Sequence, residues 1–299
     1  MLGQLQDPDL HLLRLFVTVV EAGGFSAAQG VLGLSQPSIS QQMARLETRL
    51  GYRLCSRGKS GFRLTEKGER LLEATRGLLV QIEQFRQQAN GVAGRLLGTL
   101  RIGMAENQDK VITLRLAEAI GRFRQREESV QLELISAPPA ELERLLLEQR
   151  LDYAISYFSG NQAAFDYQPL FEETQRLYCG RQHPLFTQGQ VDRQALLEAD
   201  QVRHSYRLLK GGEPFMSQRS SAQAEQIDSV LTFILSGRHI GYLPCHCAGP
   251  WEAQGALRVL DPSLDFVVPF TLARHRGRVP GEAQQAFAKD LLAAFACAA

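Results

Sequence analysis

The chain has 299 residues, enough for two or three domains with a large buried core. Its 33 Lys and Arg residues nearly balance 32 Asp and Glu residues, but residues 1–95 hold 12 basic against 8 acidic side chains and the remainder holds 21 against 24. The start of the chain lacks a basic segment followed by an apolar block, and no run of about 18 apolar residues occurs, so we expect a cytoplasmic protein without membrane contact. Five scattered cysteines, an odd number, argue against a disulfide framework.

Residues 25–50 predict two short helices that meet at a tight turn. Ser26 is a good N-cap for the first helix, and Gly33 suits the left-handed residue that ends it. Gly30, inside this helix, costs up to about 1 kcal/mol relative to alanine. Between cap and end, a small apolar face is expected from Ala27, Ala28, Val31 and Leu32. This arrangement predicts a helix-turn-helix.

The second helix of the pair has an apolar side and a polar side. Ser35 can cap it, and Pro37 fits its first turn, where a missing N–H costs little. Apolar residues recur at spacings of three and four and so face inward: Ile39, Met43, Leu46 and Leu50. The remaining groups suit base edges and phosphates in a major groove: Gln36, Ser38, Ser40, Gln41, Gln42 and Arg45. Any amphipathic helix needs a polar face, so periodicity alone leaves an ordinary surface helix as the alternative.

A strand, a Gly-rich basic turn and a second strand are predicted over residues 52–57, 58–61 and 62–65. Together with the two helices, they predict a winged helix-turn-helix. Arg57, Lys59 and Arg63 place positive charge on this hairpin, where contacts to DNA phosphates would fix the register of the recognition helix. The alternative for these charges is a solvated loop.

Residues 10–68 resemble the N-terminal domain of LysR-type transcriptional regulators. The resemblance is carried by LFVTVVEAGGFSAA, LSQPSISQQMARLETRLG and LCSRGKSGFRLTEKG, and it covers the domain without a gap. It implies binding to double-stranded promoter DNA, with Ser26, Ser35 and Pro37 added to the outward residues above as candidate DNA-binding positions. Gln29, Gly30 and Cys55 depart from the family pattern, although none of them is a base-reading position.

One long helix, opened by Thr65, is predicted over residues 66–90. Its apolar residues form a heptad seam, widened by a second stripe: Leu71, Thr75, Leu78, Ile82, Phe85 and Ala89, then Leu72 and Leu79. So wide a stripe favours pairing with a second copy, although a helix packed on its own subunit is the alternative. The helix would extend about 40 Å, which suits two reading heads about one DNA turn apart. The resemblance supports the dimer, because the family's linker helix has this position.

From Thr99 onward, strands and helices alternate. Strands at 100–104, 130–135 and 151–158, with helices over 110–126 and 139–149, indicate a parallel sheet covered by helices. A second unit follows, with a strand from Leu170, helices near 192–199 and over 223–236, and a strand at 240–243. The chain can return to the first unit after Val267 and end in a helix over 281–296.

This α/β order resembles the effector domain of the same family, which is itself similar to periplasmic solute-binding proteins. We therefore expect a winged helix-turn-helix over 1–66, a linker and dimerisation helix over 67–95, and a two-lobed effector-binding domain over 96–299. Lobe I would comprise about 96–158 and 267–299, and lobe II about 159–266.

Ligands of open α/β sheets bind beyond the carboxyl ends of the strands, near helix N-termini. This rule selects the candidate effector-binding residues: Glu106, Asn107, Gln108, Ser136, Pro139, Arg203, His204, Ser205, Asp228 and Ser229. Many relatives have hydroxyl residues near the first helix start and at the position of Pro139, and those hydroxyls often hold a carboxylate. Here an acid or amide and a proline stand there, so Glu106 could face a cationic or hydroxylated ligand instead. For each residue, an ordinary solvated loop is the alternative.

Cys245-His246-Cys247 places three soft-metal ligands in a row. Cysteines that share one ion are usually separated by two to four residues. We therefore expect a buried strand-to-loop segment after Pro244, no metal and no cofactor; a redox-sensing thiol is the other alternative.

These features predict a DNA-binding regulator, a homodimer that assembles into a homotetramer as its relatives do, with a small-molecule effector bound between the lobes. A constitutive architectural DNA-binding protein without an effector is one alternative. An enzyme is another, using Cys179 with His183 or Ser205 beside His204, but neither pair has a supporting motif such as GxSxG. We therefore expect no enzymatic activity.

Overall fold

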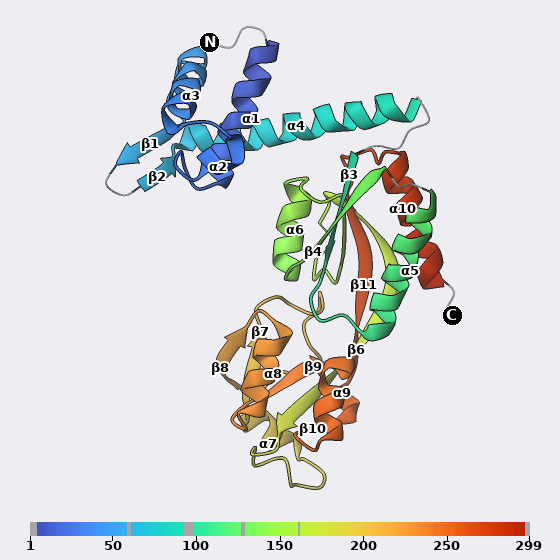
Figure 1. Ribbon diagram of the computed structural model, residues 1–299. Helices are drawn as coiled ribbons and strands as arrows, with labels where there is room; N and C mark the ends of the chain where they lie inside the picture. The colour runs from blue at the N-terminus through green and yellow to red at the C-terminus, as the bar shows by residue number, and fades with distance from the viewer. Residues whose placement is uncertain (1–4, 59–60, 93–97, 127–128, 161, 297–299) are drawn as a thin grey trace. The chain divides into compact units, whose positions relative to one another are not determined.

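The computed structural model describes residues 5–58, 61–92, 98–126, 129–160 and 162–296. Its contacts divide the chain into two compact units, residues 1–89 and 90–299 (Figure 1). None of the helices in these described stretches combines the length and the apolar character needed to cross a bilayer.

The first unit is a winged helix-turn-helix, as predicted. It contains α1 (Asp7–Glu21), α2 (Ala28–Leu32), α3 (Gln36–Leu50), β1 (Cys55–Gly58), β2 (Gly61–Leu64) and α4 (Glu66–Val92). Gly33 has φ +63° and ends α2, and the Ser35 hydroxyl accepts a hydrogen bond from Ser38 N at 3.4 Å to cap α3. The antiparallel strands β1 and β2 form the wing.

The predicted cap and apolar face of α2 were partly wrong. The helix begins at Ala28 with Ala27 at the N-cap, and the Ser26 hydroxyl instead donates to Gln36 Oε1 at 3.3 Å. Because α2 has only five residues, one side of a single turn can be buried. Ala28 is that buried residue, whereas Ala27 is exposed and Val31 is 72% exposed.

The inward side of α3 forms the core of the first unit together with α1. Ile39, Met43 and Leu46 are buried against residues such as Phe16, as the spacing predicted. Beside this core, Arg49 Nη2 donates to the buried carboxylate of Asp9 at 2.7 Å. The hydrogen bond from Gln6 N, with the Arg49 guanidinium beside it, holds the pKa of Asp9 below its ordinary value. These contacts tie α1 to α3.

The long helix α4 is buried in its first half and more open in its second. The Thr65 hydroxyl accepts from Gly68 N at 3.0 Å, which confirms that Thr65 opens the helix. Leu72 and Thr75 are buried, and other apolar residues of the two stripes pack on the core of the first unit: Leu71, Leu78 and Leu79. Phe85 is 71% exposed. Packing on its own subunit therefore accounts for the first half of the seam, and pairing through the rest stays a prediction.

The described strands of the second unit form one nine-stranded sheet. They are β3 (Gly98–Met104), β4 (Val130–Ser136), β5 (Tyr153–Ser156), β6 (Phe165–Gly180), β7 (Asp200–His204), β8 (Arg219–Ala224), β9 (Ile240–Pro244), β10 (Leu257–Val259) and β11 (Phe266–His275). The order is β4-β3-β5-β11-β6-β9-β7-β8, with β10 paired to β6. β3 pairs in parallel with both β4 and β5, so the predicted parallel βαβαβ unit is confirmed.

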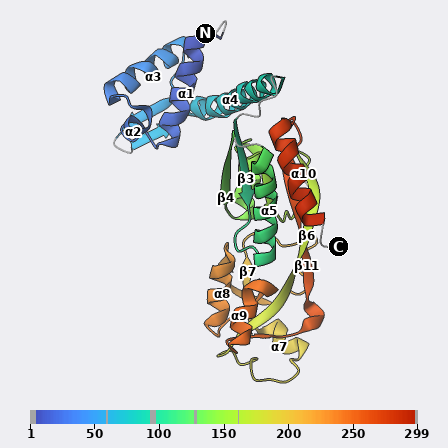
Figure 2. The same ribbon diagram turned by 45° about the vertical axis from the view of Figure 1, so that its right-hand side comes forward.

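Helices cover both faces of this sheet. They are α5 (Lys110–Arg126), α6 (Pro139–Leu147), α7 (Arg193–Glu198), α8 (Ile227–Leu235), α9 (Cys245–Ala253) and α10 (Glu282–Ala296), with a short 3-10 turn η1 (Pro262–Leu264). In lobe I (β3–β5, α5, α6 and α10), α5 and α10 lie side by side on one face and α6 covers the other (Figure 2). Lobe II contains β7–β10 and α7–α9, and the antiparallel strands β6 and β11 run through both lobes.

One prediction in lobe II was correct only in part, and another was wrong. The helix expected over 223–236 is present as α8, but it begins at Ile227, because residues 223 and 224 still belong to β8, which pairs with β7. The strand-to-loop segment expected after Pro244 is helix α9, and Cys245 and Cys247 in its first turn are half-buried. β7 lies in a stretch for which the sequence predicted neither a strand nor a helix.

We predict opposite effects for two glycine substitutions in α4. A Cβ at Gly68 would overlap the backbone carbonyl of Leu54, so Gly68→Ala should lower the free energy of unfolding by roughly 1–3 kcal/mol. Gly77→Ala, in the same helix with open space around it, should raise it by about 0.5–1 kcal/mol. Urea denaturation followed by circular dichroism measures both. Equal effects of the two substitutions would contradict the close approach of α4 to Leu54.

Candidate DNA interface and effector pocket

The outer side of α3 carries the predicted polar groups. The side chains of Gln36, Pro37, Gln41 and Arg45 are exposed, those of Ser38, Ser40 and Gln42 are half-buried, and Ser26 and Ser35 are exposed beside them. Gln42 is drawn toward α1, because its Oε1 lies 3.0 Å from His11 Nε2. The other groups form one accessible surface of amides, hydroxyls and a guanidinium, which is the chemistry that reads base edges in a major groove.

Gln29 fastens the turn between α2 and α3. Its Oε1 accepts from Gln36 N at 3.2 Å, and its Nε2 donates to the Ser26 carbonyl at 3.2 Å. The first turn of α3 is therefore anchored by a residue that departs from the family pattern. Gln36 Oε1 is already engaged by Ser26, so the Gln36 Nε2 amide is the group that faces outward with donors to offer.

The wing is held to the end of α3 by Glu47. Its Oε1 accepts from Leu54 N at 2.7 Å, just before β1. On β2, Arg63 is exposed and lies opposite Ser56 in the register, and Arg57 lies on β1. Arg53 is a further exposed cation next to the wing that the sequence analysis did not select. Lys59 lies outside the described residues.

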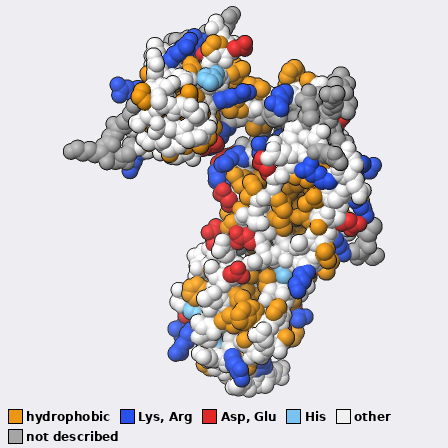
Figure 3. All heavy atoms as spheres, viewed as in Figure 1, with side chains coloured by type: hydrophobic (Ala, Val, Ile, Leu, Met, Phe, Trp, Pro, Cys, Tyr) orange, Lys and Arg blue, Asp and Glu red, His pale blue; other side chains and the backbone are white. Residues whose placement is uncertain are grey.

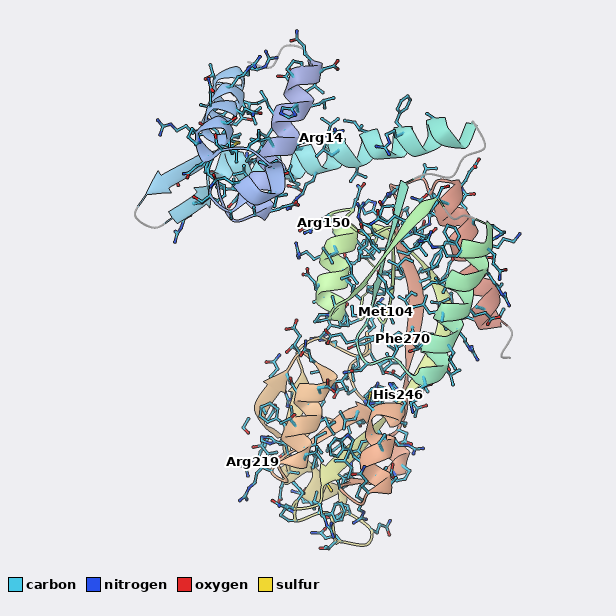
Figure 4. All side chains as sticks on the ribbon, in the orientation of Figure 1. Arg14, Met104, Arg150, Arg219, His246 and Phe270 are labelled. Carbon is cyan, nitrogen blue, oxygen red and sulfur yellow. The ribbon has the colours of Figure 1, made fainter. Side chains whose placement is uncertain are left out.

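A solvent-open cleft lies in the second unit between lobes I and II. It is lined by Ala105, Glu106, Asn107, Pro138, Pro139, Tyr157, Glu173, Gln175, Leu208, Glu225, Gln226, Ile227, Pro244 and Phe270. Met104, Phe270 and His246, labelled in Figure 4, lie in this region. Figure 3 shows acidic side chains gathered where the two lobes meet. The cleft lies at the carboxyl ends of β3, β4, β8 and β9, as expected for a ligand site in an open sheet.

One carboxylate of this pocket, that of Glu173, is largely buried. Its side chain is 11% exposed, and burial raises its pKa to about 7. Gln175 Nε2 donates to Glu173 Oε1 at 2.7 Å, and His246 Nδ1 lies 3.6 Å from Glu173 Oε2. Gln175 pairs with both β11 and β9, so it is the residue at which β6 changes its pairing partner. Glu173 lies two residues before it on the same strand.

Two further carboxylates belong to the pocket. Glu106 Oε1 accepts from Gln226 Nε2 at 3.4 Å, which links the end of β3 to the start of α8. Glu225 is exposed and follows β8. Asn107, between β3 and α5, has φ +55°, and its carbonyl accepts from His246 Nε2 at 2.7 Å. The lining contains no lysine or arginine among the residues that the structure describes.

The structure brings three of the predicted effector residues to the pocket: Glu106, Asn107 and Pro139. The remaining predicted residues are not part of its lining: Gln108, Ser136, Arg203, His204, Ser205, Asp228 and Ser229. Arg203 Nη2 donates to the Ser217 carbonyl, and His204 Nε2 lies 3.0 Å from the Tyr242 carbonyl, so both are engaged in the fold of lobe II. The sequence analysis missed Tyr157, Glu173, Gln175, Glu225 and Gln226.

The alternative chemistries considered for the sequence have no arranged site. Burial raises the pKa of Cys179 to about 11, and His183 Nδ1 accepts from Leu185 N, so the two are not poised as a nucleophile and base. The His204 ring is held by the Tyr242 carbonyl. Among the described residues, no group of three His, Cys, Asp or Glu side chains is placed to hold a metal ion.

Comparisons with known proteins identify the families of the two parts of the chain. The family model described as LysR substrate binding domain matches residues 93–296, and that of the bacterial regulatory helix-turn-helix proteins of the lysR family matches residues 10–69. The chain is 37% identical over 283 residues to the HTH-type transcriptional activator BauR of Pseudomonas aeruginosa, covering 93% of each chain. It is 30% identical over 292 residues to the nitrogen assimilation regulatory protein nac of Klebsiella aerogenes, covering 92% of each. Full-length CbnR complexed with target DNA has the same fold, with a TM-score of 0.61 at 19% identity over 95% of this chain and 99% of that chain.

The raised pKa of Glu173 predicts a pH-dependent stability difference. An acid with a raised folded-state pKa contributes stability below its unfolded pKa, near 4.5, and loses it as pH rises through about 7. Glu173→Gln should therefore match the parent chain near pH 4.5 and exceed its free energy of unfolding above pH 7, by up to about 3 kcal/mol. Urea denaturation across this range measures the difference. A difference that does not change with pH would contradict the buried, titrating carboxylate.

Proposed function

The chain belongs to the LysR family of transcriptional regulators, and we propose that α3 reads operator sequence while the pocket between lobes I and II holds the effector. Membership in this family makes the chain a DNA-binding transcriptional regulator with an effector-binding domain, not an enzyme. The accessible amide and hydroxyl surface of α3 is the observation that supports base reading. The surface comprises the residues selected from the sequence on this helix and its cap: Ser35, Gln36, Pro37, Ser38, Ser40, Gln41 and Arg45.

We further propose the domain limits 1–66, 67–95 and 96–299, and a homodimer joined through α4. With 27 residues, α4 is about 40 Å long. That length suits two copies of α3 held in successive major grooves, about 34 Å apart. The exposed side chain of Phe85 gives the second half of α4 an apolar group for a partner helix. A tetramer built from two such dimers, acting in the cytoplasm where promoter DNA is accessible, completes the proposal.

Regulation requires that the effector bind one arrangement of the lobes better than another. The proposed pocket takes lining residues from lobe I, lobe II and β6, so its shape depends on how the lobes are arranged. A tenfold preference of the effector shifts such an equilibrium by about 1.4 kcal/mol. That shift is enough to alter the spacing or bending of bound promoter DNA without releasing it.

The DNA assignment predicts two kinds of binding defect. Gln36→Ala removes a base-edge amide and should reduce the preference for operator over random DNA by about tenfold, equivalent to about 1.4 kcal/mol. Arg63→Ala removes a phosphate contact and should weaken binding to all sequences alike, lowering the slope of log affinity against log salt by about one. Gel shifts with operator and random duplexes, repeated at several salt concentrations, separate the two effects.

Arg122→Ala is the matched control, because Arg122 is a surface cation on α5 that pairs with Glu118 in the effector unit. It should change neither the specificity nor the salt slope. If Gln36→Ala and Arg63→Ala weaken operator and random DNA to the same extent, α3 does not read the bases.

A further inference from the structure

The charged side chains of the pocket between the lobes are hydrogen-bond acceptors. Glu106, Glu173 and Glu225 contribute three carboxylates to its described lining, and no basic side chain of the described lining balances them. An acidic cluster alone identifies no ligand. The amide of Gln175 supplies a second, independent observation.

Gln175 is only 1% exposed, and its Oε1 has no hydrogen-bond partner among the described residues. Its orientation is set by Glu173, since the Nε2 group donates to that carboxylate at 2.7 Å and the reverse orientation would place two acceptors together. Leaving a buried acceptor without a partner is unfavourable. Gln175, a residue of the pocket lining, therefore has an amide oxygen that a ligand donor could satisfy.

The second oxygen of Glu173 also has room for a donor. His246 Nε2 lies 2.7 Å from the Asn107 carbonyl, which can only accept, so this nitrogen carries the proton. In the neutral ring, Nδ1 then has no proton to donate to Glu173 Oε2, 3.6 Å away. The closest polar neighbour of Glu173 Oε2 on α9 is therefore not a hydrogen-bond donor.

The rest of the lining is apolar and suits an aliphatic chain. The start of α6 is a poor binding site for an anion. Tyr157 and Phe270 pack edge to face at 5.3 Å, and Leu208 and Ile227 add apolar wall. Pro138 and Pro139 stand at the start of α6, and neither has a backbone N–H to offer a carboxylate. Glu106 and Glu225, from the ends of β3 and β8, add acceptors away from β6.

We propose that the effector is an aliphatic compound bearing a protonated primary amine, which donates to the Glu173 carboxylate and to Gln175 Oε1. The chain of the ligand lies against Tyr157 and Phe270, and where the ligand is a diamine its second ammonium group is neutralised by Glu106 and Glu225. This inference rests on the proposed function only in taking the pocket as the effector site. The proposed ligand is defined by its ammonium group, which diamines and amino acids both carry.

The amine site is expected to depend on pH. Glu173 is faced by Gln175 on β6, by His246 and Cys247 on α9, by Asp109 before α5 and by Tyr157 after β5. With a pKa of about 7, the ionised fraction of Glu173 rises about tenfold between pH 6 and pH 8. The amine should therefore bind about tenfold more tightly at pH 8, where it is still protonated.

The test is isothermal titration calorimetry of the full chain with 1,4-diaminobutane, 4-aminobutanoate and butanedioate at pH 8 and pH 6. We expect both amines, or the diamine alone, to bind, and butanedioate not to bind. Glu173→Gln should weaken amine binding at least about tenfold and remove its pH dependence. Glu172→Gln is the matched control, because Glu172 is the neighbouring exposed residue of β6 and is absent from the pocket lining; it should bind the amine like the parent chain.

Tighter binding of butanedioate than of the amines, no binding of either amine, or equal amine binding by Glu173→Gln and the parent chain would each overturn the inference. Gel shifts on the same preparations keep this result separate from the proposed function. Sequence-specific DNA binding without amine binding refutes only the ammonium ligand, whereas loss of sequence preference in the parent chain refutes the regulator itself.

Discussion

The effector unit depends on the antiparallel pairing of β6 with β11. This ladder runs from Phe165 opposite His275 to Gln175 opposite Phe266, and β6 then continues along β9 from Gln175 to Cys179. One strand therefore passes through both lobes. Because Gln175 is the residue at which β6 changes its pairing partner, and Glu173 lies two residues before it, the ladder fixes two buried side-chain acceptors of the pocket. Next to Phe270 the register shifts, and Leu170 is the extra residue on β6.

In the DNA-binding unit, polar side chains position the recognition helix α3 and the wing. Gln29 holds the first turn of α3, and Glu47 holds the segment that enters β1. Both use a side-chain oxygen to accept backbone N–H groups that helix and strand termini would otherwise leave unpaired. α2 is only one turn long and buries only Ala28, so apolar packing alone gives it little support. The Gln29 amide offsets the weak helix, which explains how the chain tolerates Gly30 there.

The sequence predicted those elements whose signal was local. The spacing of Ile39, Met43 and Leu46 identified α3, and the helix expected over 110–126 has the same limits as α5. β8 was missed because pairing with β7, a contact between segments distant in sequence, determines the strand over Arg219–Ala224 and delays the start of the predicted helix to Ile227. Because the end of β8 was not predicted, Glu225 and Gln226 were not recognised as pocket residues. Glu173 and Gln175 were missed because only the pairing of β6 with distant strands places them at the cleft.

Among the hydrogen bonds that cross from lobe I to lobe II around the cleft, three show how ligand binding could be coupled to lobe geometry. Gln226 reaches Glu106, His246 reaches the Asn107 carbonyl, and the Tyr206 hydroxyl donates to Glu143 Oε2 at 3.0 Å. The first two engage residues of the pocket lining, so a ligand that donates to the same acceptors exchanges contacts between the lobes for contacts to itself. Only such an exchange gives the effector different affinities for two lobe arrangements, which any ligand-driven change requires. The acidic lining therefore acts both as the recognition surface and as part of the contact between the lobes.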